Sequence, residues 1–114
     1  MSVQGQGFRA WLLQRISAVY IGIYLVVASV CIMINIDNVS YVQWQQMLST
    51  PFINISLLLF FYAIFLHTWI GSRDIIIDYV KPVSLRLVLL AAIALGIIVM
   101  LLWVSLILLS VLQL

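Results

Sequence analysis

His67 is the residue whose chemistry stands out first in this chain. It lies in a run, residues 38–72, that contains no aspartate, glutamate, lysine or arginine. An ionisable ring inside a membrane segment is costly, which makes it a functional candidate by default. The chain has a single histidine, so a site that needs two imidazoles must take the second from another polypeptide. The residue therefore points to a partner.

The surroundings of His67 favour a ligand for haem iron. A neutral imidazole is a good axial ligand, and Gly71, one helical turn later, lacks the side chain that would obstruct a macrocycle lying against the helix. At 100° per residue, His67, Gly71, Asp74 and Asp78 share one stripe, with about 16 Å between His67 and Asp78 if the helix continues that far. The alternative stays open that His67 bonds to a neighbouring helix and that Gly71 only permits close packing.

Asp78 and Tyr79 stand where this helix is expected to leave the membrane, shortly before Pro82. A phenol there can donate a hydrogen bond to an apolar ligand with carbonyl oxygens, such as a quinone, while the neighbouring carboxylate orients the donor. Equally open is a tyrosine that anchors the interface and an aspartate that pairs with Lys81.

The elements that position these residues are membrane helices. The chain is 67% apolar and 7% charged, with a mean hydropathy of +1.30, and soluble domains carry about a quarter charged residues. Three runs without charge each exceed the roughly 20 residues that span a bilayer; they cover 16–36, 38–72 and 87–114. We predict an all-α membrane protein, a single domain over 1–114 whose three transmembrane helices, near 12–34, 52–74 and 86–111, belong to a larger helical bundle.

The basic residues predict the orientation of these helices. All five precede the first span or flank the second loop, namely Arg9, Arg15, Arg73, Lys81 and Arg86. By the positive-inside rule the N-terminus and the loop 75–85 are cytoplasmic, whereas the loop 35–51 and the C-terminus are periplasmic. The first apolar stretch is too long for a signal peptide and no cleavage site follows it, so we expect it to remain as a helix. The residues before it are not rich enough in arginine and serine for an organelle transit peptide, which favours a bacterial inner membrane.

Two weaker patterns concern packing. Residues 40–48 suit a short helix lying in the membrane interface, with Ser40 as its N-cap and aromatic anchors at Tyr41 and Trp44. Small residues recur four apart in the first and third helices, where they predict close helix contacts; the pairs are Ala18 with Gly22 and Ala92 with Gly96.

One string resembles a known family. His67-Thr68-Trp69-Ile70-Gly71, six residues, then Asp78-Tyr79-Val80-Lys81-Pro82 is similar to the second helix and following loop of the smaller membrane anchor, the cytochrome b small subunit, of bacterial succinate dehydrogenase (respiratory complex II). The length, the three-helix layout and the arginine that opens helix one, Arg15, also match. The resemblance covers nearly the whole chain.

The resemblance implies an anchor that holds a flavoprotein subunit and an iron-sulfur subunit at the cytoplasmic face and that shares a b-type haem and a ubiquinone site with a sister cytochrome b anchor. His67 would then be one axial haem ligand and Gly71 would give the haem clearance. Tyr79 would bond to a ubiquinone carbonyl, with Asp78 as its neighbour, and Arg15 is a candidate for a haem propionate. A snorkelling Arg15 is the alternative.

Other classes remain to be weighed. An anchor of a quinol-fumarate reductase shares the architecture, and a purely structural anchor would have lost its haem, against which His67 argues. A small oligomeric transporter needs a carboxylate within the membrane, but all three acids lie outside the apolar runs. Succinate oxidation itself has no flavin motif or cysteine cluster here. Membrane lipids are expected partners and nucleic acid is not.

Overall fold

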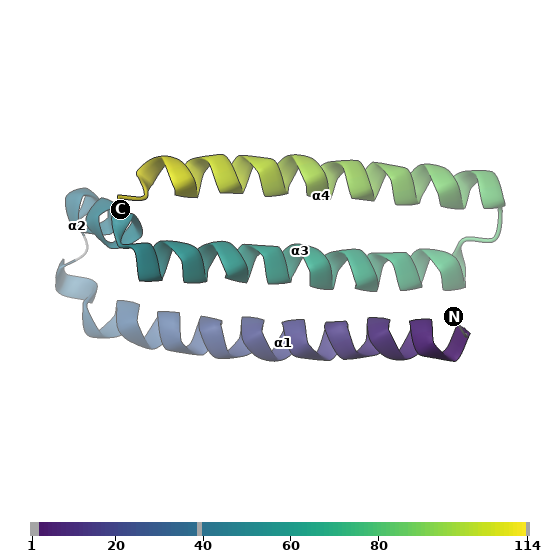
Figure 1. Ribbon diagram of the computed structural model, residues 1–114, viewed down its shortest axis with the longest axis horizontal. Coiled ribbons are helices and arrows are strands. Elements are labelled where there is room, and N and C mark those ends of the chain that lie inside the picture. Colours follow the sequence, from purple (N-terminus) through teal and green to yellow (C-terminus); the bar gives the residue numbers. More distant parts are fainter. Residues whose placement is uncertain (1–2, 39, 114) are drawn as a thin grey trace.

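The chain forms three long antiparallel helices packed side by side, with α3 between α1 and α4 (Figure 1). The structure, a computed structural model, describes residues 3–38 and 40–113. The long helices are α1 (Val3–Ile34), α3 (Pro51–Tyr79) and α4 (Val83–Val111); the 3-10 helix η1 (Ile36–Asn38) and the short helix α2 (Tyr41–Ser49) follow α1.

Each long helix is long and apolar enough to cross a membrane, over Gly7–Ile34, Pro51–Tyr79 and Val83–Val111. The prediction of an all-α protein with three spans is therefore confirmed. The short η1 and α2 segments lie at one end of the bundle, here called the α2 end (Figure 1). The N-terminus and the connection between α3 and α4 lie at the other, the Tyr79 end.

The helices are longer than the sequence indicated. The first begins at Val3 rather than near residue 12, and the loop expected at 75–85 is only Val80–Pro82. Three isoleucines, 75 to 77, carry the second long helix on to Tyr79. It stops there because a residue that precedes proline is disfavoured in the α region, and Pro82 then serves as the N-cap of α4.

The short helix near residues 40–48 is confirmed as α2, and so is its cap. The Ser40 side chain accepts a hydrogen bond from the Gln43 backbone N–H at 3.2 Å, and the Gln43 side chain accepts one from the Ser40 backbone at 3.1 Å. This reciprocal capping box satisfies two donors that the first turn would otherwise leave unpaired. α2 lies across the end of the bundle instead of extending one of the long helices (Figure 1).

Asn54 joins three elements at the α2 end. Its side chain is fully buried, and its amide donates to the Leu48 carbonyl at 2.8 Å and to the Leu108 carbonyl at 2.6 Å. Nearby, the Gln113 backbone N–H donates to the Ser49 carbonyl at 3.1 Å. Hydrogen bonds in a site without water hold helices together because few other partners are available.

Hydroxyl groups join the long helices farther along. Tyr20 of α1 donates to the Ser56 carbonyl of α3 at 3.0 Å, and the Tyr24 hydroxyl lies 3.2 Å from the Ser56 hydroxyl. Between α3 and α4, the Tyr62 and Ser105 hydroxyls are 2.6 Å apart. Small numbers of polar contacts, rather than a large apolar core, therefore align the three helices.

Most apolar side chains face outward. Among the described side chains, the buried apolar ones are Phe60, Ile70, Ile76 and Leu108. The expected small-residue contacts are not made within this chain, because a Cβ added at Gly22 or Gly96 would have no atom within 4 Å. Ala18 and Ala92 are exposed as well. So much outward apolar surface suits a lipid environment and neighbouring membrane helices.

Candidate functional site

His67 lies on the side of α3 that faces α1. Its side chain is half-buried. Nδ1 is 3.2 Å from the Ser17 hydroxyl, and Nε2 is 3.5 Å from the amide nitrogen of Gln14. The ring thus makes the cross-helix contact that the sequence left open as a packing alternative. That contact and iron ligation are compatible, because the firmer of the two contacts uses Nδ1 and leaves Nε2 with a long one.

The side chain of Gln14 lies next to Nε2 of His67 and beside Gly71. A Cβ added at Gly71 would lie 3.5 Å from Nε2 of Gln14, so the glutamine side chain occupies the place beside this glycine. The Oε1 atom of Gln14 is buried without a hydrogen-bond partner. A side chain held by one long contact, with an unsatisfied oxygen, costs little to displace. His67 and Gly71 therefore fit an axial ligand beside a clearance for haem.

Arg15 is not brought to His67. It is exposed, and within the described residues its guanidinium contacts Trp11, at 5.6 Å from the ring centroid. Gln14 and Ser17 occupy the face of α1 that meets α3, and Arg15 projects from a different face. A role toward a haem propionate consequently needs a haem that reaches past the flank of α1.

Asp78 and Tyr79 lie on the last turn of α3 and are exposed, Tyr79 to 79%. At 1.5 Å per residue, Asp78 is about 16 Å along the helix from His67. α3 therefore carries two separate candidate sites, the His67 imidazole against α1 and the Tyr79 phenol on its last turn. The ion pair expected as an alternative, Asp78 with Lys81, is absent from the part of the chain that the structure describes.

Arg86 holds the end of α3 in place. From the start of α4 its guanidinium donates to the Val80 carbonyl at 2.9 Å and 3.2 Å and to the Ile77 carbonyl at 3.3 Å. Carbonyls at a helix C-terminus lack partners within the helix and carry partial negative charge, which a cation neutralises. This clamp fixes the turn that presents Asp78 and Tyr79.

Arg73 and Asp74 pair with each other. The Arg73 guanidinium lies 3.2 Å from the Asp74 carboxylate, and both side chains reach solvent. Neighbouring residues on an exposed surface gain little from such a pair. Asp74 shares the stripe of His67 and Asp78, and the pair contacts neither of them among the described residues.

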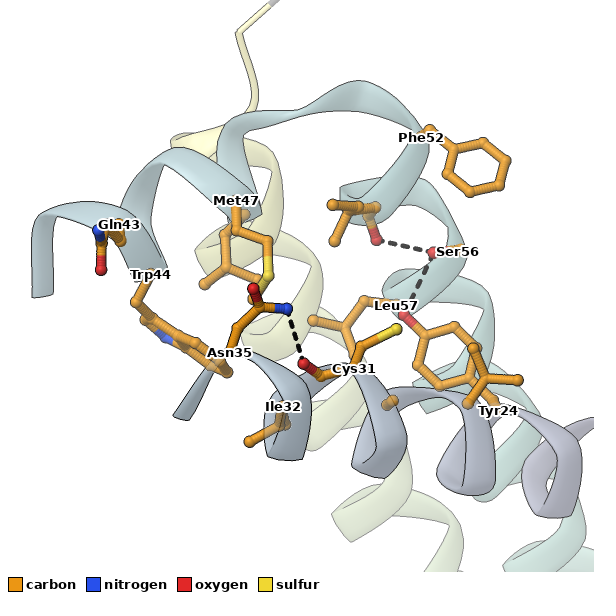
Figure 2. Close-up of a pocket in the computed structure, with 14 residues that line it drawn as sticks. Tyr24, Cys31, Ile32, Asn35, Gln43, Trp44, Met47, Phe52, Ser56 and Leu57 are labelled. Atoms are coloured by element: carbon orange, nitrogen blue, oxygen red, sulfur yellow. Dashed lines mark hydrogen bonds between the residues drawn. The ribbon is translucent and has the colours of Figure 1, made fainter. Parts of the chain in front are cut away.

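A cavity of about 540 Å³ opens at the α2 end, away from the predicted site residues (Figure 2). Its walls are mainly apolar and come from α1, α2 and α3, with Cys31, Trp44, Met47 and Leu57 among them. Polar groups in its lining bond within the chain, as Asn35 does to the Cys31 carbonyl at 2.9 Å (Figure 2). Its chemistry is that of a groove for apolar groups.

From the sequence, no site role was assigned to three residues that contact His67 or the last turn of α3, namely Gln14, Ser17 and Arg86. A usable pattern did exist for the first two. Gln14, Ser17, Tyr20 and Tyr24 recur three or four apart in an otherwise apolar helix, and all four contact α3. Polar side chains at that spacing mark the buried face of a membrane helix. Arg86 carried no such signal, because its partners are backbone atoms across a turn.

The fold and these sites define a multi-pass helical membrane protein with an intramembrane histidine on its central helix. Comparison with known proteins identifies the family of this membrane protein. Residues 4–108 match the family described as "Succinate dehydrogenase/Fumarate reductase transmembrane subunit". The chain is also 38% identical over 84 residues, 74% of its length and 72% of the relative's, to the succinate dehydrogenase hydrophobic membrane anchor subunit of Coxiella burnetii. It belongs to the succinate dehydrogenase/fumarate reductase transmembrane subunit family and is a membrane anchor.

Proposed function

We propose that this chain anchors the flavoprotein and iron-sulfur subunits of a bacterial succinate dehydrogenase to the membrane and, with a second cytochrome b anchor, binds haem b and forms the ubiquinone-reduction site. The family match and the named relative support the anchor role. Succinate oxidation itself belongs to the partners. The observation that carries the haem assignment is the geometry of His67.

His67 is the proposed iron ligand through Nε2. Ser17 engages its other ring nitrogen at 3.2 Å, and Gly71 and the displaceable Gln14 side chain leave room on the ligand side. The second axial ligand is a histidine of the partner anchor, since this chain has one histidine. Bound haem supplies a one-electron redox centre whose potential depends on its ligands and on their hydrogen bonds.

Tyr79 is the proposed quinone-binding residue. Its hydroxyl is exposed on the last turn of α3 and is free to donate to a ligand from outside the chain, with Asp78 beside it. Arg86 supports this turn through the Val80 and Ile77 carbonyls. Ubiquinone is apolar with two carbonyl acceptors, which suits a phenol donor at the edge of the hydrocarbon.

The Tyr79 end is proposed to face the cytoplasm of a bacterium and the α2 end the periplasm. All five lysine and arginine residues lie in the N-terminal half of α1 or near the connection between α3 and α4, and the chain brings both regions to one end (Figure 1). That distribution follows the positive-inside rule. It also sets the quinone residue on the side where soluble subunits would dock.

A quinol-fumarate reductase anchor is the second candidate, because the family description names both enzymes. The two functions use one architecture in opposite electron directions, and potentials of the redox centres decide between them. Rates of succinate oxidation and of fumarate reduction by the same purified complex, each with ubiquinone and with menaquinol, separate them.

The haem assignment is tested by His67→Ala in the complex purified with its partner chains. The reduced-minus-oxidised spectrum should lose or markedly change its b-type signal, because a methyl group cannot coordinate iron. Asn35→Ala, an exposed change at the α2 end, is the control and should keep the spectrum. An unchanged spectrum in His67→Ala would show that the histidine only packs.

The quinone assignment is tested by Tyr79→Phe, which keeps the ring and deletes the hydroxyl. Succinate-to-ubiquinone transfer should fall by the equivalent of one hydrogen bond, about 1 to 3 kcal/mol in transition-state terms. Succinate oxidation with a soluble acceptor should persist, since those electrons leave before the membrane. Tyr41→Phe, also highly exposed but at the α2 end, is the matched control. A wild-type rate of ubiquinone reduction in Tyr79→Phe would show that Tyr79 only anchors the helix at the membrane interface.

The orientation is tested with single cysteines at positions 44 and 81 in a Cys31→Ala background. A membrane-impermeant thiol reagent should label position 44 in intact spheroplasts, and position 81 only after the membrane is opened. Removal of Cys31 is needed because it is exposed. Labelling of position 81 alone in intact spheroplasts would show that the orientation is the opposite of the one proposed.

A further inference from the structure

Ser17 is a buried hydroxyl in the membrane span of α1, and the proposed function names it only as a contact of His67. It is 4% exposed. Its Oγ–H donates to the Gln14 backbone carbonyl at 2.9 Å, one turn back in the same helix. A hydroxyl has one proton and two acceptor positions. Toward any further neighbour, Ser17 can therefore only accept.

That neighbour is Nδ1 of His67, at 3.2 Å. Because Ser17 has committed its proton to the Gln14 carbonyl, the proton of this second hydrogen bond must come from the ring, which fixes it on Nδ1. A neutral imidazole carries one N–H, so Nε2 holds the lone pair. The second contact of the ring agrees, because the Gln14 amide N–H₂ that faces Nε2 at 3.5 Å is a donor.

We propose that Ser17 is a positioning residue that sets the Nδ1–H tautomer and the ring orientation of His67 and so presents Nε2 to iron. This inference rests on the haem assignment proposed above. Groups that accept a hydrogen bond from the N–H of a ligating histidine fix its tautomer and increase its basicity. A more basic imidazole stabilises ferric over ferrous iron, so the hydrogen bond to Ser17 lowers the haem midpoint potential.

Substitutions in the purified complex test this role. Ser17→Ala removes the acceptor, and Ser17→Thr restores it, since a threonine hydroxyl in a helix also bonds back to a carbonyl of the preceding turn. Ser105→Ala is the matched control: that serine also donates to a carbonyl of the preceding turn and bonds across helices, but to Tyr62 rather than to His67. Haem content, midpoint potential and the low-temperature EPR spectrum of the ferric haem are measured for each variant.

Ser17→Ala should keep its haem, raise the midpoint potential and broaden the low-spin ferric EPR signal, because the ring loses an orienting contact. The expected change is less than tenfold in the ratio of ferric to ferrous stability, below about 59 mV for a one-electron couple. Ser17→Thr and Ser105→Ala should match the wild type. If Ser17→Ala assembles poorly, Ser17→Cys, whose sulfur is a weaker acceptor, should shift the potential in the same direction.

Wild-type potential and EPR spectrum in Ser17→Ala would overturn the inference, as would a Ser17→Thr complex that behaves like Ser17→Ala. An equal shift in Ser105→Ala would do the same, since it would reveal a general packing effect. Failure of the underlying haem assignment looks different: His67→Ala would then keep the haem signal of the wild type. The two failures are thus read from separate variants.

Discussion

Asn54 and His67 are two polar side chains on the same membrane helix, and they are held in opposite ways. Asn54 is fully buried and gives both amide hydrogens to backbone carbonyls, at 2.6 Å and 2.8 Å. His67 is half-buried and contacts only side chains, at 3.2 Å and 3.5 Å. Backbone partners cannot move without disturbing helices, whereas a glutamine side chain can turn away. The first arrangement holds helices together, and the second includes a side-chain partner that the proposed haem would displace.

The contrast extends to the two helix contacts of α3. Toward α4, the hairpin is tied at both ends and between them, by Asn54, the Tyr62–Ser105 pair and Arg86. Toward α1, the contacts of His67 near the Tyr79 end are to side chains alone. An amide oxygen is buried without a hydrogen-bond partner on both sides, Oε1 of Gln14 toward α1 and Oδ1 of Asn54 toward α4. The two contacts of α3 therefore differ in the partners of the amide nitrogens, which are two backbone carbonyls for Asn54 and one ring nitrogen at 3.5 Å for Gln14.

The largest effect on stability is expected for Asn54→Ala. Two buried hydrogen bonds are lost and the Leu48 carbonyl loses its side-chain donor, so the free energy of unfolding should fall by about 2 kcal/mol. Thermal or denaturant unfolding of the complex, followed by helical circular dichroism, measures it. Asn35→Ala, which deletes an exposed amide bonded to the Cys31 carbonyl, should cost much less. The haem midpoint potential should stay unchanged; a shifted potential would erase the distinction between the two residues.

Arg86→Ala should act on the quinone residues without reaching the haem. It removes hydrogen bonds to the Val80 and Ile77 carbonyls and so loosens the turn that carries Tyr79. We expect the apparent KM for ubiquinone to rise about tenfold, equivalent to about 1.4 kcal/mol, with a normal haem spectrum. Lys81→Ala, which removes an exposed cation from the same loop, is the control. Equal effects of the two variants would assign the loss to charge instead of to the clamp.

Tyr62→Phe should weaken the hairpin modestly. The 2.6 Å contact with Ser105 is short, yet cross-helix hydrogen bonds in membrane proteins contribute about 1 kcal/mol or less. The free energy of unfolding should drop by about that amount, while Tyr41→Phe, whose ring is exposed on α2, should leave it unchanged. A loss as large as that of Asn54→Ala would mean that side-chain partners hold this fold as firmly as backbone partners do.

Gln14→Ala should have the smallest effect. Its amide makes one long contact and its oxygen none, so the free energy of unfolding should change by less than about 0.5 kcal/mol, and haem content should not fall. Gln46→Ala, an exposed glutamine on α2, gives the baseline. A strong destabilisation by Gln14→Ala would contradict the claim that this side chain is readily displaced.

The sequence was sufficient for the spans and for the cap at Ser40, because charge-free length and local capping chemistry decide them. It was insufficient for the loop between α3 and α4, where the Asp78-Tyr79 pair suggested an emerging chain although the isoleucines before it kept the helix intact. The small-residue pairs that contain Gly22 and Gly96 meet no helix in the described part of this chain, and their contact with a partner helix stays a prediction. Nothing in the spacing tells whether such a face meets a helix of the same chain or another surface.

The residues of the proposed sites divide in the same way. His67, Gly71 and Tyr79 could be selected from residue type and position, because an imidazole in an apolar run is unusual wherever it points. To select Ser17, one must know how α1 is rotated about its own axis. That rotation depends on the whole polar face of α1 and not on any one residue. The outward position of Arg15 depends on that same rotation.

The three-residue connection Val80–Pro82 also has a consequence for the order of synthesis. His67 meets its partners Gln14 and Ser17 on a helix that is made earlier, and Tyr79 is in place before α4 begins. When α4 follows, so short a connection allows it only to fold back along α3, guided by contacts that span few residues, such as Arg86 with Val80. The residues proposed to bind haem and quinone are therefore all synthesised by residue 79, and α4 then packs against the helix that carries most of them.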